Sequence, residues 1–235
     1  NVFSANPPIA IFSPARRGRD NTTKHTYENV KVHAECVINI VNYDMVQQMS
    51  LSSTEYPQGV SEFIKSGLTP ISSLSVSPKR VAEAPVQLEC KVKEVIELGT
   101  EGGAGNLVVC HIVQIHIDEK VLDANGRIDP YLIDQVARMG GDWYSRARLG
   151  MFEVPKPLER CGMGVDQLPT DIRWSKVLTG NHLGMLGNTE VVPNETDVNE
   201  YKLTELSDLF LELQDDAPAL EKALHQRAAL LLDEN

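Results

Sequence analysis

"VQLECKVKEVIELGTEGGAGNLVVCHIVQIHID", residues 86–118, contains two runs that alternate apolar and polar side chains. The first half of the first run alternates strictly, and the second run, 106–118, alternates over most of its length. The glycine-rich segment 99–105 between them is typical of a tight turn. It is not a phosphate-binding loop, because no helix pattern and no Gly-Lys-Ser/Thr motif follow it. The stretch therefore predicts an antiparallel β-hairpin.

The segments on either side of this hairpin are short. Buried strands are predicted at 8–13 and 36–41. Helices are predicted at 25–33, 43–53 with Asn42 as its N-cap, 56–67 after an initial turn and ending at Gly67, 129–138, and in a leucine-rich tail at 201–233. No βαβ unit repeats. This order favours an antiparallel barrel or sandwich with inserted helices over a doubly wound sheet.

The composition excludes several classes of function. The 235 residues carry a formal net charge of −11, which argues against a nucleic-acid-binding or anionic-membrane surface. No window approaches the roughly 18 apolar residues of a membrane span. The four cysteines are far apart and form no zinc-ligand pattern, so we expect buried free thiols and a cytoplasmic protein.

Hydrolytic chemistry has little support in the sequence. There is no Gly-x-Ser-x-Gly motif, no cysteine lies in a reactive context, and no pair of carboxylates stands out. The six histidines are scattered. His111 and His116 are expected on opposite faces of one strand, without obvious partners and with structural roles.

A basic loop follows the first strand. Residues 16–26 contain Arg16, Arg17, Arg19 and Lys24 together with three threonines, on an acidic chain. The loop leads into a helix, whose free N–H groups and dipole favour an anion. Arginine and lysine both bind phosphate, and the small size of the cluster fits a terminal phosphate monoester. The alternative is an ordinary solvated loop.

Several motifs then occur in the order typical of one family. They are "NVFSANPPIAIFSPARR" at 1–17, "KHTYENV" at 24–30, "CVINIV" at 36–41, "YPQGVSEF" at 56–63, "SGLTP" at 66–70, "RVAEAPVQLEC" at 80–90, and "GRIDP…ARMGGDWYSR" at 126–146. Through them, residues 1 to about 157 resemble the flavin reductase-like family, which binds FMN on a split β-barrel and includes flavoredoxin-like proteins.

The resemblance implies a mainly β fold with inserted helices. Residues 1–157 would form an antiparallel, Greek-key split barrel, and residues 158–235 a helix-rich C-terminal extension. It also implies a homodimer with FMN near the subunit interface and NAD(P)H as a transient co-substrate.

The same resemblance implies a flavin site. Asn1, Phe3 and Ser4 match the segment that lines the isoalloxazine ring. The segment that holds the ribityl and phosphate oxygens is matched by Ser13, Arg16, Lys24 and Thr26. Tyr144 is expected near the flavin, the alternative for Trp143 and Tyr144 being core packing. Arg17 and Arg19 are expected to face solvent.

Two departures from the family pattern stand out. His25 occupies a position where family members often have Asp, which caps a helix better. Family members also carry a few dozen residues, with the opening barrel strands, before the stretch that begins at Asn1. We therefore expect the whole protein to be longer, and a barrel without those strands to leave open strand edges.

Three functions remain open at this point. The first is an NAD(P)H-dependent flavin reductase that passes hydride to flavin N5, for which the cofactor carries the chemistry and no catalytic side chain is needed. The second is an FMN-binding electron carrier or flavin-binding protein without reductase activity. The third is a non-enzymatic scaffold whose acidic helical tail engages a partner protein.

Overall fold

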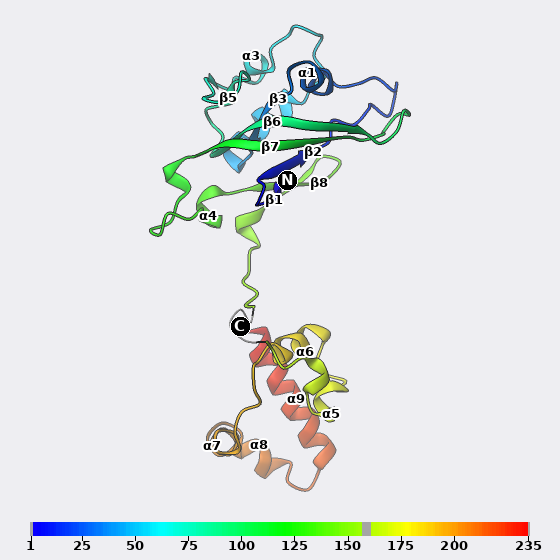
Figure 1. Cartoon of the computed structure of the whole chain (residues 1–235). Helices are drawn as coiled ribbons and strands as arrows, with labels where there is room; N and C mark the ends of the chain where they lie inside the picture. The colour runs from blue at the N-terminus through cyan, green and yellow to red at the C-terminus, as the bar shows by residue number, and fades with distance from the viewer. Residues whose placement is uncertain (1, 157–160, 235) are drawn as a thin grey trace. The chain divides into compact units, whose positions relative to one another are not determined.

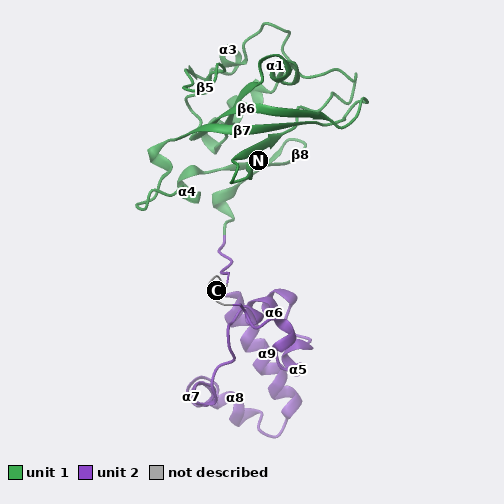
Figure 2. Ribbon diagram, in the orientation of Figure 1, with its two compact units in different colours: residues 1–151 green, residues 152–235 purple. Residues whose placement is uncertain are grey.

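A computed structural model describes residues 2–156 and 161–234 (Figure 1). The chain divides into two compact units, residues 1–151 and 152–235, each considered by itself (Figure 2). The boundary expected at residues 157 and 158 lies outside the described residues.

A five-stranded antiparallel sheet dominates the first unit, with strand order β1-β2-β7-β6-β3. Its strands are β1 (Val2–Ser4), β2 (Ile9–Phe12), β3 (Glu35–Ile40), β6 (Val86–Glu97) and β7 (Asn106–Ile117). The two long strands β6 and β7 form the predicted hairpin, paired from Val86 opposite Ile117 to Glu97 opposite Asn106. The predicted strands at 8–13 and 36–41 are confirmed as β2 and β3.

The remaining elements of this unit are short. The helices are α1 (His25–His33), α2 (Val46–Ser52), α3 (Glu62–Ser66) and α4 (Pro130–Ile133), with 3-10 turns η1 (Tyr43–Met45), η2 (Glu119–Val121) and η3 (Ala147–Leu149). The small strand pairs are β4 (Pro70–Ile71) with β5 (Arg80–Val81), and β8 (Val136–Gly140) with β9 (Trp143–Arg146). The helix at 25–33 is confirmed, and Gly67 ends α3 in the left-handed conformation that favours glycine (φ 69°).

The described strands make an open sheet. Its two edges are β1 and β3, and the sheet does not close into a barrel within residues 2–156. The expectation of a β-rich unit with helices inserted between strands is met, as is that of open strand edges. The strand order leaves the Greek-key connection untested.

One face of the sheet carries the apolar core. Ala10, Leu88, Cys90, Val108 and Cys110 are buried there, so the alternation of β6 and β7 sends every second side chain inward. The four cysteines are free thiols as predicted, but only Cys90 and Cys110 are fully buried, and Cys161 is exposed. The Sγ atoms of Cys36 and Cys110 lie 3.7 Å apart inside this core, without a disulfide.

Two sequence predictions were wrong in detail. The helix expected at 129–138 ends at Ile133, because Asp134 adopts the left-handed conformation (φ 49°) and β8 begins at Val136. The helix expected at 43–53 starts as the 3-10 turn η1. Asn42 precedes that turn, but its side chain does not cap it, and its Oδ1 is buried without a hydrogen-bond partner.

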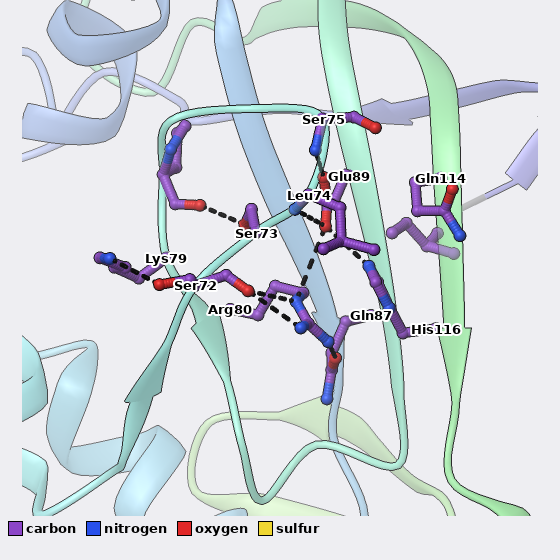
Figure 3. A network of polar contacts seen from close by, with 12 residues as sticks. Ser72, Ser73, Leu74, Ser75, Lys79, Arg80, Gln87, Glu89, Gln114 and His116 are labelled. Atoms are coloured by element: carbon purple, nitrogen blue, oxygen red, sulfur yellow. Dashed lines mark hydrogen bonds and ion pairs between the residues drawn. The ribbon is translucent and has the colours of Figure 1, made fainter.

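The opposite face of β6 carries a buried carboxylate. Glu89 is 0% exposed and accepts hydrogen bonds from the backbone N–H of Leu74 (2.8 Å) and Ser75 (2.6 Å). The ring of His116 on β7 lies 2.6 Å from the same carboxylate, and the Arg80 guanidinium lies 3.6 Å away (Figure 3). Burial raises the pKa of Glu89, but the two N–H groups and His116 outweigh it and hold the pKa below its usual range.

The side chain of Gln87 joins this network. It accepts from Arg80 (2.7 Å) and donates to the carbonyls of Val81 (3.0 Å) and Ala84 (2.7 Å). Arg80 in turn donates to the Ser72 carbonyl (2.9 Å; Figure 3). The segment from Ser72 to Ala84 is therefore fastened over the sheet by two polar side chains of β6.

The second unit is helical. Its elements are η4 (Val165–Gln167), α5 (Thr170–Arg173), α6 (Gly180–Gly187), α7 (Glu195–Glu205), α8 (Ser207–Glu212) and α9 (Ala217–Asp233). Two buried histidines connect them: His182 on α6 pairs with Asp233 (2.8 Å), and His225 on α9 bonds to Ser175 (2.9 Å). The predicted helical tail is confirmed. Among the described residues, no helix is long and apolar enough to cross a membrane.

Removing the charge of Glu89 should lower the free energy of unfolding strongly. Replacing Glu89 by Gln removes the buried charge and places an amide NH₂ against a backbone N–H donor. We expect the free energy of unfolding to fall by about 2–4 kcal/mol at pH 7, measured by urea denaturation. Glu94→Gln, on an exposed position of the same strand, is the matched control and should change it by less than about 0.5 kcal/mol.

The pH dependence of this difference follows from the lowered pKa of Glu89. The charged carboxylate stabilises the fold fully above its usual value of 4.5, and this contribution is lost as the pH falls through the lower pKa of the folded state. The gap between wild type and the Glu89→Gln variant should therefore stay constant from pH 7 to about 5 and shrink below that. A gap that does not change with pH would show that the charge of Glu89 is not what stabilises the segment.

Candidate functional site

The basic loop lies between β2 and α1 and is bound to the turn of the β6–β7 hairpin. The backbone N–H of Arg16 donates to the Ala104 carbonyl (2.9 Å). A Cβ at Gly102 would lie only 3.0 Å from the carbonyl oxygen of Gly18. The glycine-rich turn that the sequence contains is thus required for this close approach of the two loops.

Arg16 holds the loop in shape. Its Nε donates to Asn21 Oδ1 (2.6 Å) and its Nη2 to the Asn21 carbonyl (2.7 Å). Asn21 adopts the left-handed conformation (φ 60°), and its amide donates to the Thr100 carbonyl (3.0 Å). The third guanidinium nitrogen, Nη1, has no acceptor among the described residues.

Arg17 and Arg19 share one carboxylate across the loop. Arg17 Nε lies 2.9 Å from Glu55, and Arg19 pairs with the other oxygen of Glu55. Arg19 is 68% exposed, as expected. Arg17 is only 17% exposed and also donates to Thr22 (3.0 Å), so the expectation that it faces solvent was wrong. Glu55 neutralises much of the positive charge that these arginines bring.

The start of α1 keeps its polar groups available. Lys24 precedes the helix in an extended conformation, and no side chain caps the helix. This agrees with the presence of His25 where family members often have Asp. Among the described residues, no hydrogen bond or ion pair engages the side chains of Lys24 and Thr26, which are exposed. An uncapped N-terminus beside a free ammonium and a free hydroxyl favours an anion.

The remaining predicted site residues lie on three elements. Ser13, after β2, accepts from the backbone N–H of Asn106 (3.2 Å). Phe3, 73% exposed, and the half-buried Ser4 lie on the edge strand β1. Asn1 lies outside the described residues. The segment Phe3–Ser4 lies beside Ile9 and Ala10 in the first half of β2, and Ser13 directly follows the last residue of that strand, whose four Cα atoms span about 10 Å.

A hollow of about 800 Å³ lies beside the loop. Its lining comes from the loop, the start of α1 and the chain after α2, through Arg17, Arg19, Thr22, Thr23, His25, Glu28 and Thr54–Pro57. Ser13, Arg16, Lys24 and Thr26 are not among these residues, so the structure does not bring the predicted phosphate-binding residues together in this hollow.

Tyr144 lies in a different hollow, of about 590 Å³, between α2 and the β8–β9 hairpin. It is 37% exposed, and its neighbour Trp143 is 79% exposed. The core-packing alternative for these two aromatic residues is therefore wrong for this unit.

The wall of this second hollow contains a buried ion pair that the sequence did not reveal. Arg146 donates to Asp134 through Nε (2.9 and 3.0 Å) and Nη2 (2.5 Å), and its guanidinium carbon lies 3.7 Å from the centre of the Tyr43 ring. The hydrogen bond from Arg146, with the charge of Arg148, holds the pKa of Asp134 below its usual range despite burial.

Metal chemistry has no visible site in the described part of the chain. Residues 2–156 and 161–234 contain no group of three or more His, Cys, Asp or Glu side chains arranged to hold a metal ion.

Comparison with known proteins finds a matching family and related proteins for this chain. The family model for the flavin reductase-like domain matches residues 1–135. An uncharacterized protein of Aquifex aeolicus is 31% identical over 147 residues, which make up 63% of this chain and 72% of that protein.

Two solved structures are similar in fold and sequence. Nitrilotriacetate monooxygenase component B from Bacillus cereus is 28% identical, with a TM-score of 0.60 over 66% of this chain and 75% of that one. A protein from Shewanella frigidimarina, proposed to be a flavin reductase with a split barrel domain, is also 28% identical. Its TM-score is 0.56 over 66% of this chain and 74% of that one.

Proposed function

Because the chain belongs to the flavin reductase-like family, we propose that it is an FMN-binding flavoprotein and an NAD(P)H-dependent flavin reductase or related oxidoreductase. FMN, when bound, supplies the hydride acceptor at its N5 atom. The protein then has to bind and orient the flavin and to stabilise the charge that develops on it, and no side-chain acid or base is required.

The observation that carries the proposal is the anion site at the start of α1. Lys24 and Thr26 are exposed and unengaged beside an uncapped nine-residue helix. These donors fit a terminal phosphate monoester, because they are few and close together. Arg16 holds the loop through Asn21 and leaves Nη1 directed away from its protein partners, so it would add one further donor to the phosphate oxygens.

The position of β1 supports an elongated flavin nucleotide. The exposed Phe3 lies on β1, which pairs with Ile9 and Ala10 in the first half of β2, whereas the loop that leads to the anion site follows the other end of β2. A phosphate at Lys24 and a flat aromatic ring system at Phe3 would use both ends. The similarity to a proposed flavin reductase and to a monooxygenase component agrees with this assignment.

Exposed apolar side chains on the first unit support the homodimer. They include Phe3, Ile64, Met139, Trp143 and Leu149, each between 68% and 82% exposed. Soluble monomers rarely leave so many large apolar groups in water. We propose that a second copy covers them.

Sedimentation equilibrium tests this homodimer. It should give twice the mass of 26.0 kDa, and a single-chain mass at micromolar concentration would contradict the dimer.

Binding of FMN tests the anion site directly. We expect the full chain to bind FMN, detected as a shift of the flavin absorption band and quenching of its fluorescence. Replacing Lys24 by Ala should raise the Kd for FMN about tenfold or more, because one charge-assisted hydrogen bond to phosphate is lost. Riboflavin, which lacks the phosphate, should bind the wild type and this variant equally.

A matched control uses Lys31→Ala in the same helix. Lys31 pairs with Glu97 (3.0 Å) in the last turn of α1, away from the proposed phosphate position. This variant should keep the FMN affinity of the wild type. Equal FMN affinities for Lys24→Ala and the wild type would instead favour the non-enzymatic scaffold.

Reductase activity is tested separately from flavin binding. FMN-loaded protein is mixed with NADH or NADPH without oxygen, and the absorbance near 450 nm is followed. We expect one of the two nucleotides to bleach the flavin faster than it bleaches free FMN. Tight FMN binding without any bleaching would leave a flavoprotein that receives its electrons from another source.

A further inference from the structure

The hollow between α2 and the β8–β9 hairpin is separate from the residues assigned to the flavin phosphate. Its volume of about 590 Å³ is within the range of small-molecule sites. None of Ser13, Arg16, Lys24 and Thr26 lines it.

One wall of this hollow is rigid without any ligand. Asp134, 7% exposed, binds the Arg146 guanidinium at two positions, and the same guanidinium is stacked on the Tyr43 ring at 3.7 Å. Arg148 lies 3.3 Å from the second oxygen of Asp134. Two cations thus share one buried anion, and Arg146 is fixed in orientation before anything binds.

The same β8–β9 hairpin supplies a second guanidinium to the hollow. Arg138 on β8 donates through Nε (3.2 Å) and Nη2 (3.0 Å) to the carbonyl of Gly141 in the hairpin turn. No carboxylate pairs with it among the described residues. The Nη1 groups of Arg138 and Arg146 are both without an acceptor within residues 2–156 and 161–234.

Cationic side chains outnumber anionic ones in the lining, since Arg138 and Arg146 face a single carboxylate, Asp142. Besides the two guanidinium groups, the side chains of Ser50, Tyr144 and Ser145 line the hollow and make no hydrogen bond with the described residues. The one carboxylate in the lining, Asp142, is likewise unpaired there. A ligand that satisfies this set needs anionic oxygens for the guanidinium groups and hydroxyl donors for the carboxylate.

A nucleotide has both kinds of group. Its phosphates provide anionic oxygens, its ribose provides hydroxyl donors, and its base provides a flat ring for the partly exposed Tyr144. We propose that this hollow is a nucleotide site. If the proposed function holds, on which this last step rests, the occupant is the nicotinamide nucleotide that reduces the flavin.

Adenosine diphosphate ribose is the probe, because it carries the shared nucleotide chemistry without the reducing ring. Its affinity for the full chain is measured by calorimetry for the wild type, Arg138→Gln and the control Arg127→Gln, which lies in the exposed turn before α4. We expect Arg138→Gln to raise the Kd about tenfold or more and the control to leave it unchanged.

A second variant separates phosphate from ribose recognition. Asp142→Asn should weaken binding of adenosine diphosphate ribose but not of inorganic pyrophosphate, which has no hydroxyl to donate to the carboxylate. Ser145→Ala, a smaller change, tests the same hollow if Arg138→Gln lowers the melting temperature. Unchanged affinity for adenosine diphosphate ribose in Arg138→Gln and Ser145→Ala would overturn the proposal.

Titration of FMN into the same variants distinguishes the two proposals. Arg138→Gln should keep the FMN affinity of the wild type. Loss of nucleotide binding in this variant with FMN binding intact supports the nucleotide site. A wild type that binds adenosine diphosphate ribose in this hollow but not FMN would end the proposed function and leave the nucleotide site standing.

Discussion

The buried carboxylate of Glu89 is the contact on which the first unit depends. It lies in the first half of β6, between β3 and β7, and is contacted by two backbone N–H donors, one imidazole and one guanidinium. A buried charge is tolerated only when its hydrogen-bonding capacity is filled, and here it is. The segment carrying those N–H groups cannot leave the sheet without exposing or stranding the charge.

This arrangement explains why the polar face of β6 is covered at all. In an antiparallel hairpin with one apolar face, the other face normally meets water. Here Gln87 and Glu89 bind the segment from Ser72 to Ala84, whose Val81 and Ala84 are also buried in a second apolar cluster with Met45 and Leu68. Specific hydrogen bonds act together with this apolar contact, so the segment has one defined position over the sheet.

The predictable part of the fold is the part set by local patterns. The hairpin follows from alternation, α1 from its spacing of Tyr27 and Val30, and the end of α3 from Gly67. The partners of Glu89 lie 9 to 27 residues away in sequence, so the alternation of β6 by itself does not show that this polar residue is buried. The helix expected at 129–138 failed for the same kind of reason, because Asp134 is held by the distant Arg146.

The number of positive residues in the basic loop overestimates the positive charge that is free to bind a ligand. Four cations in the sequence suggested a single phosphate-binding cluster, and Glu55, 36 residues from Arg19, takes up two of them. Arg16 is occupied largely by Asn21, which leaves Lys24 and the start of α1 as the free positive region. A site of that size suits one phosphate group and no more.

The two hollows differ in whether their arginines already have a carboxylate partner. Ser50 and Ser53 line the one beside the β8–β9 hairpin, and Thr54 to Pro57 line the one beside the loop. In the hollow beside the loop, Arg17 and Arg19 already pair with Glu55. In the hollow beside the hairpin, Arg138 has no anionic partner among the described residues. An anionic ligand gains more where no carboxylate competes for the guanidinium, because it displaces only water. The hollow beside the hairpin is therefore the better place for the proposed nucleotide, whereas beside the loop Glu55 pairs with the arginines and fixes the loop.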